Sequence, residues 1–497
     1  MLAFRTPALV LLALSASAAA PAAPAGPGDA GSLDGLVAGL VAASKLQPAS
    51  VTVAIIDPAT GEVLGTHRGS DRVMPASCMK VVTTAAAMTA LGAEYPLKTQ
   101  LLAPPPGRGS ESSVVPGDLW LVGYGDPGLS EHGAEGSTVA AMDAFAGQAA
   151  ARGVRTVRGD LVLDASFFDG PRVHSTWTDA GASARWYAAE VDALTCNDGC
   201  IDVAVEPGEG PGSSGRVRLV PETSAVTVVN RTTTTSVRKE HGFGFRLAEA
   251  DNTLEVWGKV WTKSTDAKSP AAIHDPVLLC AEQVGRALAR AGIRVTGVVR
   301  RPRDGEARPS SLALLAEHRT PLSAACAVAN TRSQNLWAET ILRVLGAARR
   351  GEGSFTAGAE AVRDVLAAAG PEVAAGLRQV DGSGLSRQGE SSALAMARVL
   401  AFAWKGDRRD AFFTGLARPG TGTLDNRFRD KRFEGRVFAK TGTLKGVSGL
   451  CGLAVGHSGR SYVFAVLGEH VDVGRCRKLQ DDVVGALVGF PANAARK

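Results

Sequence analysis

Beyond its first thirty residues, the 497-residue sequence has no apolar run that reaches the roughly 18 residues of a membrane-spanning helix. It also lacks a dense run of lysine or arginine: 54 basic and 49 acidic residues alternate along the chain and leave a net charge of +5. These absences exclude a transmembrane segment in the mature chain and argue against a nucleic-acid partner. The 45% hydrophobic content, combined with so small a net charge, argues against disorder.

Metal-binding and hydrolase signatures are missing as well. None of the eight histidines lies in an HExxH pattern, and no second CxxC-like pair occurs, so we expect no metal site and no cofactor. The absence of GxSxG argues against an α/β-hydrolase. The seven cysteines are an odd number, so at least one thiol is free. Cys196 and Cys200 flank an Asn-Asp-Gly turn and are the best candidate for a disulfide.

The first thirty residues are typical of an export signal. Arg5 provides a short positive start, residues 8–14 form an apolar run, and small residues follow, with Ala18 the expected last residue removed. The apolar run is too short to span a bilayer as a mature helix, and no cysteine marks a lipid anchor. We expect residues 1–30 to be a signal peptide and flexible leader, and the mature protein to be exported and soluble. An uncleaved N-terminal anchor is the alternative.

The rest of the chain changes character twice. A helix at 33–42, a strand at 50–56 with its hairpin partner, and an Ala/Met-rich helix beginning near Ser77 come first. From about Tyr95 to Arg303 the sequence is rich in short strands and turns, with one clear helix. Helices then return, and the chain ends in strands and a final helix. The helices expected after Tyr95 span 276–291, 322–330, 335–348, 357–369, 393–404 and 479–487.

This pattern predicts an α/β fold of the α+β type, interrupted by a large insertion. Residues 31–95 and 305–497 would form one domain, with an antiparallel sheet and helices packed on it. Residues 96–304 would form a mostly β inserted region of two subdomains. Three domains in series fit less well, because the segment before Tyr95 supplies a single hairpin and makes a poor independent core.

The stretch SCMK at residues 77–80 is an SxxK pattern at the start of a helix. Residues three apart share a helix face, so the Lys80 amine can reach the Ser77 hydroxyl. A lysine activates serine as a base only if burial or another cation lowers its pKa, and the neighbouring residues are apolar. On this tetrapeptide alone, a helix cap with a solvated lysine is the commoner explanation. A second copy at 236–239 is rejected, because residues three apart in a strand point to opposite faces.

Two further motifs outweigh that simpler explanation. Residues 333–335, Ser-Gln-Asn, are the only SxN in the chain and precede a helix, where Ser or Asn commonly serves as an N-cap. Residues 440–443, Lys-Thr-Gly-Thr, hold the only KTG, which could be a mere strand end. It offers a cation, two hydroxyls, and a glycine that lets a ligand lie against the strand. SxxK, SxN and KTG in this order, on helix, loop and strand, are the motif set of the penicillin-recognising serine enzymes.

With these motifs the sequence resembles the D-alanyl-D-alanine carboxypeptidase/endopeptidase family called class C low-molecular-mass penicillin-binding proteins, serine peptidase family 13. The resemblance covers nearly all of the mature chain and includes GDLWLVGYGDPGLS, EVDALTCNDGC, DGSGLSR and VFAKTGTLKGVSGLCG. The long separation of Ser77 from Ser333 agrees with the family's insertion between its first two motifs. The resemblance implies a penicillin-binding, serine β-lactamase-like transpeptidase domain in an extracytoplasmic or periplasmic protein, soluble or peripherally associated with the wall.

The resemblance also implies a reaction. A peptidoglycan stem peptide ending in D-Ala-D-Ala would bind beside the KTG strand, Ser77 would attack its penultimate carbonyl, and Lys80 would take the serine proton. Ser333 and Lys440 would relay a proton to the departing D-Ala, and β-lactams would inhibit by leaving a slow ester. The other implied roles are substrate binding by Asn335, Thr441, Gly442 and Thr443, and an oxyanion hole made by the backbone N–H groups of Ser77 and Thr443.

Two other functions remain open. A β-lactamase shares the first half-reaction but needs fast deacylation, and the sequence shows no tyrosine in place of Ser333 and no glutamate motif for activating water. An inactive wall-binding or sensor protein on the same fold is the non-enzymatic alternative, and the intact motifs argue against it. The loop at 381–384, Asp-Gly-Ser-Gly, is expected near the cleft, although turn geometry explains its glycines equally well. The balance between carboxypeptidase and endopeptidase activity is open.

Overall fold

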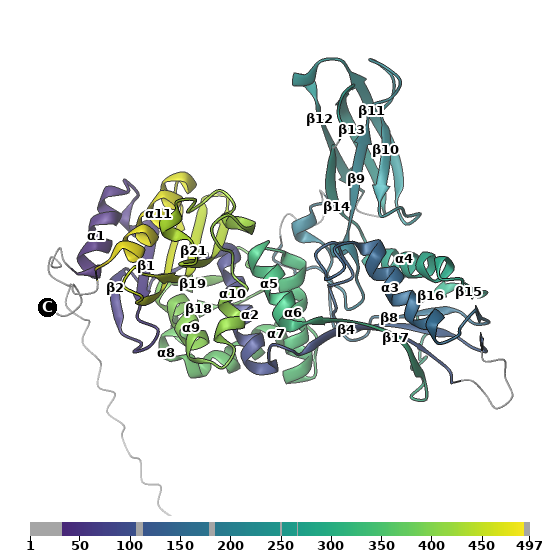
Figure 1. Cartoon of the computed structure of the whole chain (residues 1–497), viewed down its shortest axis with the longest axis horizontal. Helices are drawn as coiled ribbons and strands as arrows, with labels where there is room; N and C mark the ends of the chain where they lie inside the picture. The colour runs from purple at the N-terminus through teal and green to yellow at the C-terminus, as the bar shows by residue number, and fades with distance from the viewer. Residues whose placement is uncertain (1–31, 106–112, 178–183, 249–250, 266, 492–497) are drawn as a thin grey trace, which may run out of the picture.

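The computed structural model describes residues 32–105, 113–177, 184–248, 251–265 and 267–491 (Figure 1). The expected signal peptide and leader lie outside these residues. Among the helices of the described part, none combines the length and the apolar character that a membrane crossing requires.

A five-stranded antiparallel sheet joins the two ends of the chain in the order β2-β1-β22-β21-β20. Its strands are β1 (Val51–Ile56), β2 (Val63–His67), β20 (Val437–Leu444), β21 (Val447–Val455) and β22 (Ser461–Glu469). Because β1 pairs with β22, the N-terminal hairpin completes a sheet formed by C-terminal strands. The predicted antiparallel sheet with covering helices is confirmed.

Helices cover both faces of this sheet, so β1 is buried along its whole length. Successive strand residues point to opposite faces. Val53 and Ile55 therefore pack with α1 (Leu33–Ala43) and α11 (Val473–Gly489), and Ala54 and Ile56 belong to the core on the other face. The helices of that second face are α2 (Met79–Leu91), α5 (Leu322–Thr331), α6 (Asn335–Arg350), α7 (Phe355–Leu366), α8 (Pro371–Gly376), α9 (Ala393–Lys405) and α10 (Arg409–Thr414).

The region between α2 and α5 forms a second body beside this domain (Figure 1). Its larger sheet has the order β16-β8-β6-β4-β17 and packs with two helices, α3 (Thr138–Ala151) and α4 (Pro276–Arg290). The strands are β4 (Pro96–Ala103), β6 (Leu119–Gly123), β8 (Leu161–Asp164), β16 (Val299–Arg300) and β17 (Ala313–Pro321).

Two three-stranded sheets project from this body, in the orders β10-β9-β14 and β11-β13-β12 (Figure 1). They consist of β9 (Cys200–Glu206), β10 (Arg216–Val220), β11 (Thr227–Thr235), β12 (Gly242–Leu247), β13 (Thr253–Trp261) and β14 (Lys268–Ala272). Short strands complete two minor sheets: β5 (Val114–Val115), β7 (Thr156–Val157) and β15 (Arg294–Val295), and β3 (Arg72–Val73), β18 (Leu377–Arg378) and β19 (Glu390–Ser392).

The structure differs from the sequence-based expectation at two elements. Helix α3 was not expected, although its buried Ala141, Phe145 and Ala149 repeat at helical spacing. Strand β17 lies inside the segment expected to be catalytic, but it pairs with β4 in the sheet of the inserted region. The division into domains at the expected boundaries stays a prediction.

The candidate disulfide between Cys196 and Cys200 is a further correction, because both are free, buried thiols. The intervening turn holds three successive residues with left-handed backbone, with φ of 48° at Asn197, 57° at Asp198 and 66° at Gly199. It directs Cys196 into the core of the inserted region and Cys200 into the core around α2 and α6. The two thiols therefore face different cores.

Candidate active site

Ser77 lies in a single 3₁₀ turn, Ala76–Cys78, that leads directly into α2. Ala76 has a left-handed φ of 48°, which costs an L residue about 1–2 kcal/mol. The turn is pressed against β20: a Cβ added at Gly442 would lie 2.5 Å from the Pro75 carbonyl oxygen. The glycine of KTG thus lets the strand approach the turn of the nucleophile. The substrate-binding role expected for Gly442 stays a prediction.

The Lys80 amine is fully buried and has three hydrogen-bond partners. Its Nζ lies 2.9 Å from Ser77 Oγ, 2.7 Å from Asn335 Oδ1 and 2.9 Å from the Ser383 carbonyl oxygen. The amide and carbonyl oxygens can only accept, whereas the serine hydroxyl can also donate. A neutral Lys80 amine, with two donors and one lone pair, therefore satisfies all three partners only by accepting from Ser77.

Burial lowers the pKa of Lys80 well below its usual value, and the charge of Lys440 lowers it further. The nearby carboxyl groups of Glu339 and Asp381 act in the opposite direction. The predicted condition for a lysine base, a buried amine beside a second cation, is present.

Lys440 and Ser333 form the second pair of the site. Lys440 Nζ donates to Ser333 Oγ at 2.9 Å and to the Thr441 carbonyl oxygen at 2.7 Å. Burial lowers the pKa of Lys440 to about 8, so its amine is still mostly protonated at neutral pH. Ser333 has a left-handed φ of 63°, which aims its hydroxyl from the loop before α6 toward β20.

Asn335 is committed at both ends of its amide. Its Oδ1 accepts from Lys80, and its Nδ2 donates to the Tyr187 carbonyl oxygen at 2.6 Å. Tyr187 belongs to the inserted region, so that region reaches into the site. These two bonds use one lone pair of Oδ1 and one N–H of Nδ2, so the amide has a second acceptor site and a second donor. The substrate-binding role expected for Asn335 stays a prediction.

The Asp-Gly-Ser-Gly loop, expected near the cleft, lies directly behind Lys80. The two oxygens of the buried Glu339 carboxyl group accept the backbone N–H groups of Gly382 at 2.6 Å and Ser383 at 2.7 Å. Asp381 accepts those of Gly384 and Ser386. Burial, with Asp381 nearby, raises the pKa of Glu339 to about 8. The two carboxyl groups hold the loop so that the Ser383 carbonyl faces the lysine.

A hydrogen-bond network that the sequence did not predict connects the SxN loop to the inserted region. Asp198, in the turn between the two cysteines, accepts from Trp337 Nε1 at 2.8 Å and from Gln334 Nε2 at 3.2 Å. His132 Nδ1 lies 2.6 Å from the same carboxylate. No spacing signal could have revealed it, because each of the three partners lies more than sixty residues from Asp198 along the chain.

Two cavities border the nucleophile, and both are lined in part by Ser77, Ser333 and Thr443. One, of about 410 Å³, has aromatic and apolar walls, to which Trp177, Trp186, Tyr187, Leu385 and Leu444 contribute. The other, of about 440 Å³, is polar and is lined also by Thr441, Arg427, Arg477 and Gln480. The structure thus brings Ser77, Lys80, Ser333, Asn335 and the KTG strand together around one site.

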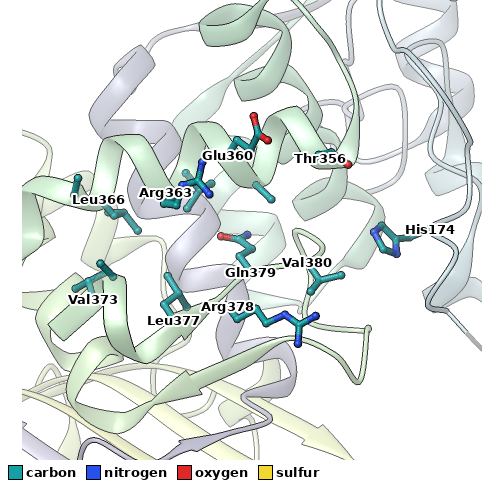
Figure 2. Close-up of a pocket in the computed structure, with 14 residues that line it drawn as sticks. His174, Thr356, Glu360, Arg363, Leu366, Val373, Leu377, Arg378, Gln379 and Val380 are labelled. Atoms are coloured by element: carbon teal, nitrogen blue, oxygen red, sulfur yellow. The ribbon is translucent and has the colours of Figure 1, made fainter. Parts of the chain in front are cut away.

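A separate cavity of about 440 Å³ lies between α7 and residues 371–380 (Figure 2). Arg363, Glu360 and Gln379 line it, and none of the predicted site residues does. Gln379 Nε2 donates to Thr83 Oγ1, on the helix that carries Lys80. In the described part of the chain, no group of three or more His, Cys, Asp and Glu residues is placed to hold a metal ion.

Comparison with known proteins matches residues 33–488 to the model of the D-Ala-D-Ala carboxypeptidase 3 (S13) family. The chain is similar to the D-alanyl-D-alanine carboxypeptidase of Actinomadura sp. (strain R39), with 32% identity over 86% of this chain and 77% of that protein. It is also similar to the D-alanyl-D-alanine carboxypeptidase DacB of Haemophilus influenzae, with 24% identity over 81% of this chain and 82% of that protein.

Among solved structures, the fold matches penicillin binding protein 4 (dacB) from Haemophilus influenzae, with a TM-score of 0.74 and 22% identity over 91% of this chain and 99% of that one. A structure of the same protein complexed with a β-lactam matches with a TM-score of 0.69 and 21% identity, over 91% of this chain and 99% of that chain. The penicillin-binding fold expected from the motifs is confirmed.

Proposed function

The chain belongs to the D-Ala-D-Ala carboxypeptidase 3 (S13) family, and on that premise we propose that it hydrolyses peptidoglycan stem peptides ending in D-Ala-D-Ala through an acyl-enzyme on Ser77. The observation that carries the proposal is the pairing of each serine hydroxyl with a buried lysine: Lys80 with Ser77 and Lys440 with Ser333. β-Lactams would acylate the same serine.

Acylation begins with the neutral Lys80 amine, which removes the Ser77 proton as the serine oxygen attacks the penultimate carbonyl. The hydrogen-bond pattern around Lys80 and its lowered pKa support this role. The backbone N–H groups of Ser77 and Thr443 would stabilise the oxyanion; one such donor is typically worth about a hundredfold or more in rate.

The leaving D-Ala needs a proton on its nitrogen when the C–N bond breaks. Ser333 would give its hydroxyl proton to that nitrogen and recover one from the Lys440 ammonium. The displaced pKa values of the two lysines support the division of labour, because one is suited to be a base and the other an acid near neutral pH. Water would then hydrolyse the ester by the reverse proton path and restore both lysines.

The two cavities suit the two ends of the substrate. The aromatic one would take the acyl part of the stem peptide, with Asn335 at its base. The polar one would take the leaving residue, whose carboxylate would bind Thr441 and Thr443 beside Gly442. Asp425 is the one acidic residue among the described residues that line either cavity, and it pairs with Arg429 at 3.5 Å. This supports a peptidase over a β-lactamase that activates its deacylating water with a carboxylate.

The test has two arms. Purified protein is incubated with a fluorescent penicillin, digested and mapped by mass spectrometry, and release of D-Ala from a diacetyl-L-Lys-D-Ala-D-Ala peptide is measured. We expect a stable adduct on Ser77 and D-Ala release, both abolished in Ser77→Ala. Rapid penicillin turnover would favour a β-lactamase, and absence of both adduct and hydrolysis would favour an inactive binding protein. Digestion of cross-linked muropeptides would separate carboxypeptidase from endopeptidase activity.

We propose in addition that the protein works outside the cytoplasm, exported by residues 1–30. Its family membership and its expected substrate support this location, because stem peptides are cross-linked in the wall. Fractionation of cells that express the full chain, with sequencing of the mature N-terminus, tests the location and the expected cleavage after Ala18.

A further inference from the structure

We propose that Arg477 binds the free carboxylate of the residue that leaves, and so makes the enzyme select stem peptides with an unmodified C-terminal acid over amidated ones. The inference rests on the proposed peptidase function and adds a residue from the last helix to the substrate site.

The position of Arg477 supports a direct contact with substrate. It lines the polar cavity of about 440 Å³ together with Ser77, Ser333 and Thr441. Its Nη2 donates to Thr443 Oγ1 at 3.3 Å. A ligand atom that reaches the KTG threonines from this cavity therefore meets the guanidinium as well.

The helix that carries Arg477 is held firmly against the catalytic sheet. On either side of it along α11, Cys476 and Gln480 are buried, and both bond to β21: the thiol donates to the Ser448 carbonyl oxygen at 3.7 Å, and Gln480 Nε2 donates to Ser448 Oγ at 3.0 Å. The backbone at Arg477 is thus fixed, while its exposed side chain is free to adjust to a ligand.

The charges around the cavity leave Arg477 as the available cation. The other arginine in the lining, Arg427, is engaged by Asp481 at 2.5 Å and by Gln480. Within the described residues Arg477 makes no ion pair, and its hydrogen bond is to a neutral hydroxyl. A guanidinium can give two parallel N–H groups to a carboxylate, a geometry that a neutral amide cannot match.

The bond to Thr443 also orients the hydroxyl. Because Thr443 Oγ1 accepts from Arg477, the threonine proton remains available to donate into the cavity. A carboxylate there would receive hydrogen bonds from both the guanidinium and the hydroxyl.

The test compares diacetyl-L-Lys-D-Ala-D-Ala with its C-terminal amide, as kcat/KM measured from the released D-Ala or D-Ala amide. The variants are Arg477→Gln and Arg477→Lys. The matched control is Arg475→Gln, since Arg475 lies on the same helix and contacts the Lys45 carbonyl oxygen instead of the cavity. We expect Arg477→Gln to lose about tenfold to a hundredfold on the acid and little on the amide. Arg477→Lys should recover part of the loss, and Arg475→Gln should match the wild type.

Equal losses on acid and amide, or an unchanged preference for the acid in Arg477→Gln, would overturn the inference while leaving the peptidase function standing. If the wild type cleaves neither peptide and forms no Ser77 adduct with penicillin, the proposed function fails, and the inference that rests on it fails too. Circular dichroism and melting temperature of each variant exclude misfolding as the cause of a loss.

Discussion

Lys440 lowers the pKa of Lys80: after burial itself, its charge is the largest influence that does so. Both amines are fully buried, and each lies 2.9 Å from one serine hydroxyl. The pKa of Lys80 falls well below its usual value, whereas Lys440 keeps a pKa of about 8. One lysine thus prepares the other to act as a base while remaining an acid itself.

Lys440→Gln tests this arrangement directly. The amide can still donate to Ser333, but it carries no charge and gives up no proton, so acylation by peptide and by penicillin should both fall by about a hundredfold or more. The Lys440 side chain is fully buried. Lys440→Arg, with its larger head, should therefore recover little activity and lower the melting temperature. Wild-type acylation rates in Lys440→Gln would show Lys440 to be a bystander.

The pH profile of kcat/KM should be bell-shaped. On the alkaline side the rate should fall above about pH 8, because Lys440 loses the proton that the leaving group needs. On the acid side it should fall as Lys80 gains a proton and ceases to be a base. In Lys440→Gln the alkaline limb should vanish. The acid limb should move to higher pH, since removing a positive charge raises the pKa of Lys80. Stopped-flow acylation across a pH series on both sides of neutrality measures both limbs, and unchanged limbs in the variant would contradict this assignment.

Gly442→Ala should separate the strand from the turn of the nucleophile. The new Cβ would lie 2.5 Å from the Pro75 carbonyl oxygen and 3.1 Å from the Cys78 backbone nitrogen, and neither atom can move without moving Ser77. We expect a stability loss of about 1–3 kcal/mol and a large drop in acylation by fluorescent penicillin. Gly39→Ala is the control, because nothing lies within 4 Å of its new Cβ in α1 and it should stabilise the helix by about 0.5–1 kcal/mol. Equal behaviour of the two variants would refute the packing role.

Asp198→Asn should loosen the SxN loop. The two oxygens of the Asp198 carboxylate bond to Trp337, Gln334 and His132, whereas the amide of the variant has only one oxygen that can accept. We therefore expect a stability loss of about 1–3 kcal/mol. Because the substitution displaces Ser333 but does not remove it, we expect kcat to fall about tenfold, with a smaller change in KM. Asp202→Asn is the matched control, since its carboxylate pairs with Lys268 at the surface. Denaturant unfolding and D-Ala release are measured for both variants. Identical results would contradict a role of the Asp198 network in positioning the SxN loop.

The sequence predicted which lysine lies beside which serine, because each pair is local or carried by motifs. Ser77 and Lys80 are three residues apart at the start of one helix, and KTG is a motif within strand β20. It did not reveal the Ser383 carbonyl behind Lys80 or Arg477 beside Thr443, because these contacts join elements that meet only in the folded sheet and its helices. The mistaken disulfide has the same origin: spacing suggested a pair, and the left-handed turn sent Cys196 and Cys200 into different cores.

The hydrogen bond from Asn335 to Tyr187 has an implication for any attempt to build a minimal enzyme. Excising the inserted region would remove the acceptor of Asn335 Nδ2 as well as that of Trp337 Nε1, so the shortened protein would carry unpaired donors beside its own base. A trimmed enzyme therefore leaves both donors to water, unless new acceptors take the place of the Tyr187 carbonyl and the Asp198 carboxylate.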